Sequence, residues 1–349
     1  MKERLEWIDW LKGIALILVI IGHTFRESMY DESMIYAYIK SFIYVFHMPL
    51  FIAISGFLFQ MKLNSYMDTN TLDFLKSKWK SYIKPLISYA IIIYASFSMV
   101  AVIPGFSNII VGGGTSLSEY FFLTIEGGNP YAVHLWYLLT IFLIVLTCNI
   151  LLKIICKTHC NQIVILFILT FLLWNIRIVF GEDFCMTVKS YLKYTIFFVY
   201  GMILNKKKIN ISTKIYSLVS VISWLYIIIY SADGIKTTVF FYRYLKNIFV
   251  LASCLVIITN FFHFARQSDT LHSKFVKYLG KNSMIFYLFH QPFCAMLGIV
   301  LFDKVGLPGY VVCIVCFMGS IILPELVIVI SKKIEIVRIA LMALFNIKV

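Results

Sequence analysis

Charged side chains are scarce in this sequence, and acidic ones are the scarcest. Of its 349 residues only 14% are charged, with 17 Asp and Glu against 31 Lys and Arg, whereas 61% are hydrophobic. There is no repeat of fixed period, no low-complexity tract and no indication of a soluble domain. Apolar runs instead reach the ~18 to 20 residues that a helix needs to cross a hydrocarbon core of about 30 Å. The composition therefore predicts an all-α, polytopic membrane bundle.

Apolar windows predict about ten membrane-spanning helices. The loop between Pro104 and Pro130 holds no Lys or Arg, whereas the segments expected on the other side hold most of the basic residues. Because basic residues are retained in the cytoplasm, both termini are expected to be cytoplasmic. We expect a transmembrane domain over residues 1–331 and a cytoplasmic or surface-lying tail over residues 332–349. The predicted spans are Ile8–Phe25, Tyr36–Phe59, Tyr82–Ile103, Tyr131–Leu152, Gln162–Phe180, Tyr191–Leu204, Ile215–Tyr230, Tyr244–Phe262, Met284–Phe302 and Tyr310–Ser331.

The placement of the charged residues and cysteines argues against a nucleic-acid surface, a disulfide framework and a metal site. The formal charge of +14 follows from the topology, and no basic stripe interleaved with stacking aromatic residues points to nucleic acid. Most of the eight Cys fall inside predicted spans, which does not suggest a disulfide framework. Cys156, His159 and Cys160 are close together, but three ligands in one short loop without a second ligand pair are more typical of ordinary loop residues than of zinc. We expect no metal.

Lys12 and His23 are ionisable residues in the first predicted span, where such groups are costly. They are eleven residues apart, a rise of about 16 Å and a rotation within about 20° of three full turns. They therefore share one helix face, with Lys12 near the inner end and His23 near the outer end. Each has an ordinary explanation: Lys12 could extend to inner headgroups or pair with Asp9, and His23 could cap the helix. Together they suit an elongated anionic donor, with a cation for its phosphates and a base where its acyl group arrives.

Five pieces of the sequence carry a resemblance to a known family. In order along the chain they are "WIDWLKGIALILVIIGH", "FHMPLFIAISGFLF", "HLWYLLTIF", "FFVYGMIL" and "LGKNSMIFYLFHQPF". Together they resemble the acyltransferase family 3 membrane proteins, particularly the branch similar to fucose 4-O-acetylases and other polysaccharide O-acyltransferases. The resemblance runs from residue 7 to about residue 293.

The resemblance implies an enzyme of a bacterial cell membrane. Such an enzyme takes an acyl group, usually acetyl, from cytoplasmic acetyl-CoA or another acyl-CoA and delivers it to a hydroxyl of a saccharide or glycolipid at the outer side. By position, Lys12 matches the family's basic residue for the CoA phosphates, and His23 matches its essential histidine. Lys in place of the commoner Arg loses a bidentate fork but keeps a point charge. Ile52 and Ala53 stand where aromatic residues are frequent in the family.

Two further histidines are candidates for the site, and each has two interpretations. His47 immediately precedes Met48 and Pro49, and Pro49 frees a backbone carbonyl. His47 is therefore either the local partner of that carbonyl or a residue that lines the acyl channel. His134 opens the fourth span at about the depth of His23, and it either belongs to an interfacial aromatic belt or stabilises an oxyanion. His290, which also precedes a proline, is expected to be a core histidine.

These residues predict a membrane O-acyltransferase in which His23 acts as the general base. A transporter or flippase for a saccharide or lipid intermediate is the alternative. It predicts inverted repeats with interrupted helices in matching halves, and the His-Met-Pro break at residues 47–49 has no counterpart. A scaffold for a polymerase complex would leave the shared face of Lys12 and His23 without a reason.

Overall fold

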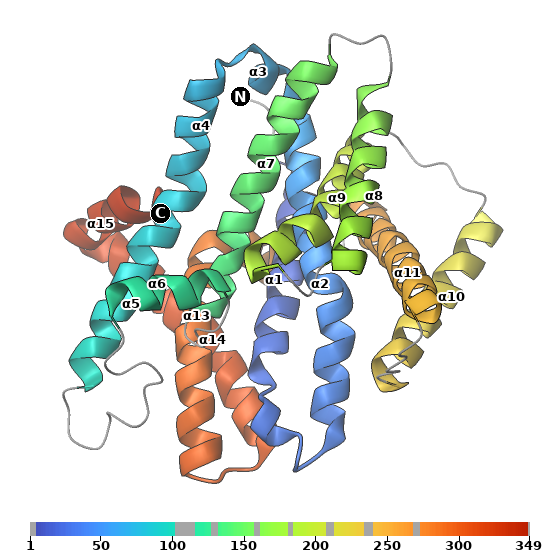
Figure 1. Cartoon of the computed structure of the whole chain (residues 1–349). Coiled ribbons are helices and arrows are strands. Elements are labelled where there is room, and N and C mark those ends of the chain that lie inside the picture. Colours follow the sequence, from blue (N-terminus) through green and yellow to red (C-terminus); the bar gives the residue numbers. More distant parts are fainter. Residues whose placement is uncertain are drawn as a thin grey trace. The chain divides into compact units, whose positions relative to one another are not determined.

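A computed structural model describes residues 5–101, 116–126, 132–156, 161–180, 184–206, 213–233, 240–267 and 273–347. Every regular element in these ranges is a helix, so the predicted all-α fold is confirmed (Figure 1). The chain divides into two compact units, and each is assembled from segments that are distant in sequence. Unit 1 comprises Met1–Leu63, Ile163–Val179 and Tyr194–Ser283, and unit 2 comprises Asn64–Gln162, Phe180–Lys193 and Met284–Val349.

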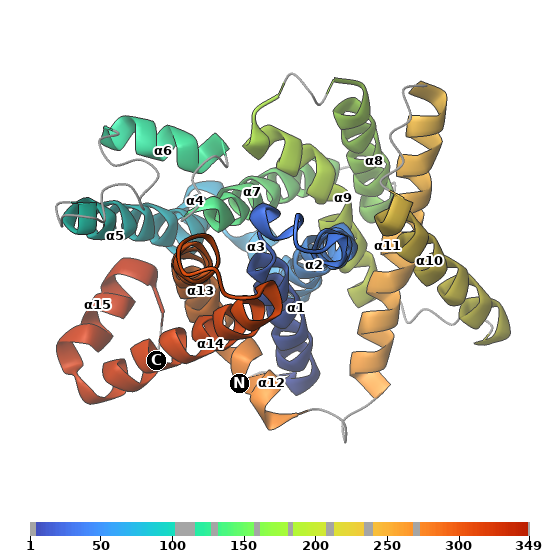
Figure 2. The ribbon, with the colours of Figure 1, turned by 90° about the horizontal axis from the view of Figure 1, so that it is seen from below.

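Unit 1 contains the two N-terminal helices and most of the central ones. Its elements are α1 (Glu6–Thr24), η1 (Glu27–Met29), α2 (Met34–Met61), most of α8 (Gln162–Phe180), the second part of α9 (Met186–Lys206), α10 (Thr213–Asp233), α11 (Phe240–Gln267) and α12 (Lys274–Lys281). Within it α1 packs against α2 and α12, and α10 packs against α11. Figure 2 shows the short helix α12 beside α1.

Unit 2 contains the remaining helices. Its elements are α3 (Leu63–Asp68), α4 (Thr71–Lys78), η2 (Trp79–Ile83), α5 (Lys84–Ala101), α6 (Leu117–Glu126), η3 (Val133–Leu135), α7 (Trp136–Ile155), the first part of α9, α13 (Ser283–Gly298), η6 (Ile299–Lys304), α14 (Gly309–Lys333) and α15 (Glu335–Phe345). α15 is separated from α14 by the extended residue Ile334. Its Phe345 contacts the rings of Tyr89 and Phe289, so the predicted tail includes a packed helix.

A helix lies at each of the ten predicted spans, and α8 begins and ends at the predicted residues. Among the described residues, eight helices are long and apolar enough to cross a membrane. The helices at the third and sixth predicted spans, α5 and α9, are not among the eight; α9 carries Lys189 and Lys193, which make it less apolar. The number of spans and the side on which the termini lie stay predictions. Most of the Pro104–Pro130 loop lies outside the described residues, and so do His159 and Cys160 of the segment considered for zinc.

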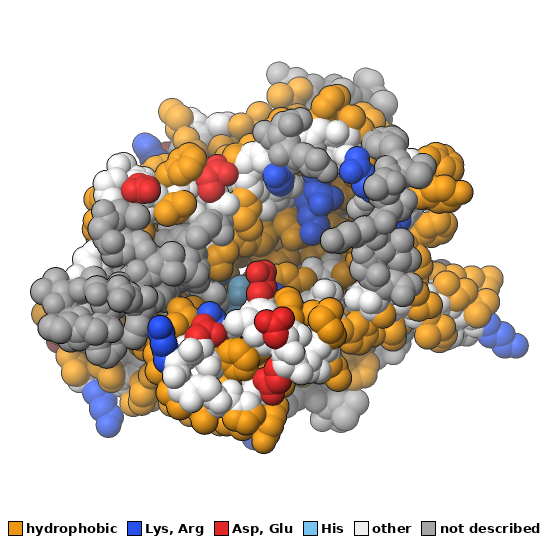
Figure 3. All heavy atoms as spheres, turned by 60° about the horizontal axis from the view of Figure 1, so that its bottom comes forward, with side chains coloured by type: hydrophobic (Ala, Val, Ile, Leu, Met, Phe, Trp, Pro, Cys, Tyr) orange, Lys and Arg blue, Asp and Glu red, His pale blue; other side chains and the backbone are white. Residues whose placement is uncertain are grey.

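The helices differ in how much of their apolar surface is buried. About 67% of the apolar window of α2 is buried, against 17% for α10. Pieces of the family resemblance lie on α1, α2, α7 and α13, which are well buried, whereas α8, α10 and α14 carry none and are mostly exposed. Figure 3 shows hydrophobic side chains over much of one face of the molecule. Exposed apolar helices of this kind suit contact with lipid.

Prolines inside helices release carbonyl groups that other segments then satisfy. Pro49 lacks the N–H that would bond the carbonyl of Val45 four residues earlier, yet α2 continues through it from Met34 to Met61. The thiol of Cys254 donates to the Val45 carbonyl at 3.4 Å. Of the two interpretations of His47, the structure does not show the local partner of that carbonyl: Cys254 of α11 bonds it, and His47 Nδ1 lies 2.8 Å from the Ile43 carbonyl instead.

Glycines in the quoted pieces let helix backbones touch. A Cβ on Gly280 of α12 would lie 1.7 Å from the carbonyl oxygen of Asp9 on α1. Likewise a Cβ on Gly56 of α2 would lie 1.9 Å from the carbonyl oxygen of Phe198 on α9. No side chain fits at either place, so these glycines are explained by helix packing within unit 1.

Candidate active site

Lys12 and His23 are carried by one unbroken helix. α1 runs from Glu6 to Thr24, so the spacing that places both residues on one face is preserved. Lys12 Nζ lies 3.9 Å from Asp9 Oδ1, and the two side chains are 24% and 10% exposed. The pairing with Asp9, one of the ordinary explanations for Lys12, is thus present. It is a long contact, at the limit of an ion pair, and Lys12 keeps part of its surface accessible.

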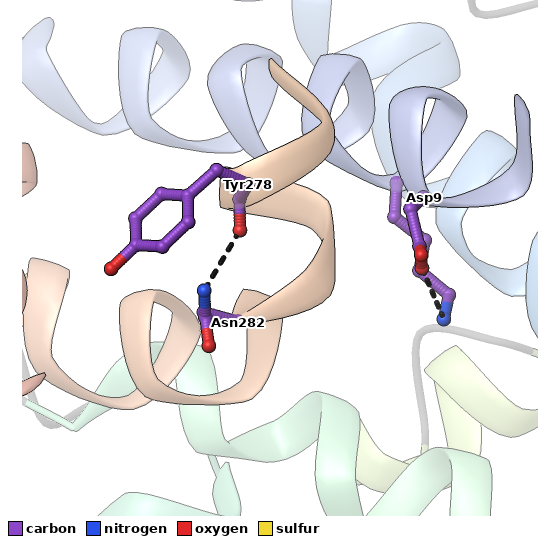
Figure 4. Close-up of polar contacts among 4 residues, drawn as sticks. Asp9, Tyr278 and Asn282 are labelled. Carbon is purple, nitrogen blue, oxygen red and sulfur yellow. Dashed lines mark hydrogen bonds and ion pairs between the residues drawn. The ribbon is translucent and has the colours of Figure 1, made fainter. Parts of the chain in front are cut away.

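Helix α12 lies beside this end of α1. Lys277 of α12 pairs with Glu6 at 2.6 Å. Figure 4 shows Asp9 on α1 and, on the facing segment, Asn282 with its amide directed at the carbonyl of Tyr278. That hydrogen bond measures 3.0 Å, and it adds a side-chain donor to a carbonyl in the last turn of α12 that also accepts the backbone N–H of Asn282. Asn282, part of a quoted piece of sequence, therefore has a structural role here.

His23, at the opposite end of α1, contacts Tyr44 of α2. The Tyr44 hydroxyl lies 3.4 Å from His23 Nδ1. Gly22 makes this approach feasible, since a Cβ at that position would lie 2.8 Å from Cε2 of the Tyr44 ring. The glycine before the histidine thus provides the space in which the tyrosine ring meets it.

Tyr44 also joins His23 to His47. The rings of Tyr44 and His47 have centroids 4.8 Å apart. His47 is buried and its Nδ1 donates to the carbonyl of Ile43 at 2.8 Å, which leaves Nε2 as the unprotonated nitrogen of the neutral ring. Lys40 Nζ lies 5.6 Å from the Tyr44 ring centroid. Lys40, Tyr44 and His47 therefore form a polar stripe along one face of α2.

His134 belongs to unit 2, and its hydrogen bond determines what it can do. Its Nε2 lies 3.2 Å from the carbonyl of Leu288, the group that Pro292 leaves without a helical donor. Since a carbonyl only accepts, Nε2 carries the proton. Nδ1 is then unprotonated in the neutral ring, and it has no hydrogen-bond partner among the described residues. A neutral His134 held in this way has no N–H to offer an oxyanion.

A second histidine and a tyrosine surround His134. The rings of His134 and His290 have centroids 5.4 Å apart, and both residues are at most 3% exposed. His290 Nδ1 donates to the carbonyl of Tyr287 at 2.8 Å, while the Tyr287 hydroxyl donates to the carbonyl of His134. His290 is buried in the core of unit 2, as expected. This cluster fits a packing role at the proline of α13.

Of the predicted site residues, the structure brings His23 and His47 together in unit 1, with Lys12 on the same helix as His23. Sequence reasoning missed Tyr44. The spacing of Lys40, Tyr44 and His47, at four and three residues, could have indicated it, because such residues share a helix face. No group of three or more metal-ligating residues occurs in the described part of the chain.

The family model described as an acyltransferase domain matches residues 5–324. The chain belongs to acyltransferase family 3. It is accordingly a multi-pass membrane acyltransferase, in agreement with its apolar helices. The resemblance seen in the five pieces of sequence is confirmed at the level of the family, whereas the fucose 4-O-acetylase-like branch stays a prediction.

Two curated relatives of this acyltransferase match it over a short stretch. Nodulation protein NolL of Sinorhizobium fredii is 49% identical over 53 residues, and Nodulation protein NolL of Mesorhizobium japonicum is 53% identical over 53 residues. In each case the match covers 14% of this chain and 14% of the relative. No solved structure matches the chain.

Proposed function

We propose that this family 3 acyltransferase is an O-acyltransferase of the bacterial cell membrane. It moves an acyl group, most simply acetyl, from cytoplasmic acyl-CoA to a hydroxyl of a cell-surface or exported saccharide or glycolipid. The observation that carries the proposal is the arrangement of unit 1. One helix bears a cation near one end and, at its other end, a histidine that contacts Tyr44 and, through it, His47.

Lys12 is the proposed contact for the phosphates of the donor. The Lys12 side chain is 24% exposed, so a phosphate can approach it. About 16 Å of helix rise separates Lys12 from His23. A donor whose phosphates lie at Lys12 would have to extend its thioester along α1 toward the other end, and the length of a pantetheine arm suits such an arrangement.

His23 is the proposed general base. If its Nδ1–H donates to the Tyr44 hydroxyl oxygen, Nε2 is the unprotonated nitrogen that can take a proton. The acceptor hydroxyl then loses its proton to Nε2 as its oxygen attacks the thioester carbon. The carbon–sulfur bond breaks, the thiolate of CoA leaves and receives the proton, and the ester remains on the acceptor. His47 lies on the other side of Tyr44, where it would help to position the acyl group.

The end of α1 that carries His23 suits a hydrophilic acceptor. The connection to α2 bears the exposed acids Glu27, Asp31 and Glu32, and Figure 3 shows acidic side chains gathered on the face that is turned forward. A saccharide can approach such a polar surface from water. The positive charges counted in the sequence predict that this end is the outer one.

Mass spectrometry of surface glycans tests the function. Cells with the gene should carry an ester that is lost on deletion and restored by the parent gene, while the gene with His23→Ala should not restore it. Identical glycans with and without the gene would contradict the proposal. The transporter alternative predicts instead that deletion stops export of unmodified glycan, and membership of an acyltransferase family favours the enzyme.

A further inference from the structure

Arg266, in the last turn of α11, is held in a fixed orientation. Its Nη2 donates to the carbonyl of Leu204 at 2.9 Å. Its Cζ lies 5.2 Å from the ring centroid of Trp7 and 5.3 Å from that of Phe57. A hydrogen bond and two aromatic faces thus restrict a side chain that in water would be mobile. The guanidinium plane is preorganised before any ligand arrives.

Arg266 is nevertheless exposed. Both carboxylates of α1 have lysine partners, because Glu6 pairs with Lys277 and Asp9 pairs with Lys12. Within the ranges that the structure describes, no carboxylate lies at ion-pair distance from Arg266. One N–H of its fork is used by Leu204, and the remaining donors are available to a ligand.

Arg266 lies at the end of unit 1 that also carries Lys12. Its contact with Trp7 places it beside the first turn of α1, and Lys12 follows Trp7 by five residues, a rise of about 7.5 Å. An immobilised guanidinium and an ammonium therefore occur at the same end of one helix. Arginine recognises phosphate through two parallel N–H donors, whereas lysine acts as a point charge.

We infer that Arg266 binds a phosphate group of the acyl-CoA donor. The inference rests on the proposed function and names a second cation for the donor site. Lys12 offers a phosphate a point charge but no bidentate fork. Arg266 supplies such a fork from α11, at the same end of the unit. An anionic lipid headgroup carries the same phosphate chemistry, and the experiment separates the two sources.

The test compares ligands with and without phosphate on the full-length protein in phosphatidylcholine nanodiscs. The probes are acetyl-CoA, 3′-dephospho-acetyl-CoA and S-acetylpantetheine, which lacks phosphate. Arg266→Ala should weaken binding of acetyl-CoA by roughly 10- to 100-fold, the effect of a lost charged hydrogen bond, and leave S-acetylpantetheine unchanged. Arg266→Lys keeps the charge but not the fork, so its affinity for acetyl-CoA should lie between those of the parent protein and Arg266→Ala. Arg338→Ala is the matched control, since it removes an exposed arginine that is paired with Glu335.

Several outcomes would overturn the inference. Equal weakening of acetyl-CoA and S-acetylpantetheine would mean that Arg266 only holds the helices through Trp7. An effect of Arg266→Ala that appears only when phosphatidylglycerol is added to the nanodiscs would assign Arg266 to a lipid headgroup. If Arg266→Ala binds acetyl-CoA as tightly as the parent protein does, the role of Arg266 is wrong, while the proposed function still stands. If the parent protein binds no acetyl-CoA, the proposed donor fails as well.

Discussion

The hydroxyl of Tyr44 lies 3.4 Å from Nδ1 of His23, and the tyrosine ring occupies space that Gly22 leaves open. The contact links the first two helices at the end of α1 opposite Lys12. It gives His23 a partner that can select its tautomer and hold its ring, as an oriented base requires.

His23→Ala should abolish acyl transfer while the protein remains inserted and folded. The variant removes the only proposed base, and general-base catalysis contributes about 10²- to 10⁴-fold in rate. His23→Gln can keep a hydrogen bond to Tyr44 but supplies no base, so it should be equally inactive. Acetyl transfer in membranes and the melting temperature in detergent are the measurements. His263→Ala, at an exposed histidine on α11, is the control. Near-normal transfer by His23→Gln would show that His23 only orients another group.

Tyr44→Phe should lower kcat by roughly fivefold to tenfold, the value of one neutral hydrogen bond, and leave KM for the donor unchanged. The ring still fills the space beside Gly22, so folding should be preserved. Tyr38→Phe is the control, because its hydroxyl on the same helix bonds a carbonyl of α10 instead. A rise in KM without a fall in kcat would place Tyr44 in substrate binding.

Lys12→Ala should raise the apparent KM for acyl-CoA, while Lys12→Arg should retain most activity. Loss of one charged contact to phosphate costs about 1.5 to 3 kcal/mol, and arginine restores both the charge and a fork. The donor titration is measured at constant acceptor. If Lys12→Ala titrates like the parent, Lys12 is needed only for its contact with Asp9.

Gly280→Ala should destabilise the protein. The new methyl group would lie 1.7 Å from the carbonyl oxygen of Asp9, so α12 must move away from α1, and overpacking of this kind costs about 1 to 3 kcal/mol. Gly319→Ala is the control, because its methyl group would meet only the end of the Leu297 side chain, which can rotate. The melting temperature in detergent should fall for the first variant and change little for the second.

Single-cysteine labelling should place the loop around Gly112–Gly114 outside the cell and the loop around Lys206–Lys208 inside. The expectation follows from the distribution of basic residues. An impermeant thiol reagent applied to intact cells should modify only the first. Modification of both loops from one side would remove a span and upset the depths assigned to His23 and His134.

The helical fold could be predicted from the sequence because the length and apolar character of each run determine a membrane helix locally. The ends of α8 were predicted to the residue for this reason. Contacts between helices depend on partners far away in the chain. His134 bonds the carbonyl of Leu288, 154 residues away, because Pro292 has removed the local donor. The pairing of Lys12 with Asp9 was among the predicted alternatives, since it is local.

The glycine positions show the same limit from another side. Gly22, Gly56 and Gly280 were quoted as parts of sequence pieces, yet nothing local distinguishes a glycine that admits a tyrosine ring from one that admits a backbone. The structure separates them by what a methyl group would strike: the ring of Tyr44, the carbonyl of Phe198 or the carbonyl of Asp9. Tyr44 was missed because its partner depends on such a space.

The uneven burial of the helices bears on how this chain can diverge. Only 17% and 22% of the apolar windows of α10 and α14 are buried. Positions on these helices need only remain hydrophobic, so leucine, isoleucine, valine and phenylalanine can replace one another there at little cost. Positions where two backbones touch allow no such exchange. As homologues diverge, sequence similarity would be lost first in the outer helices. It would persist in short inner segments where contacts between helices restrict the residue type.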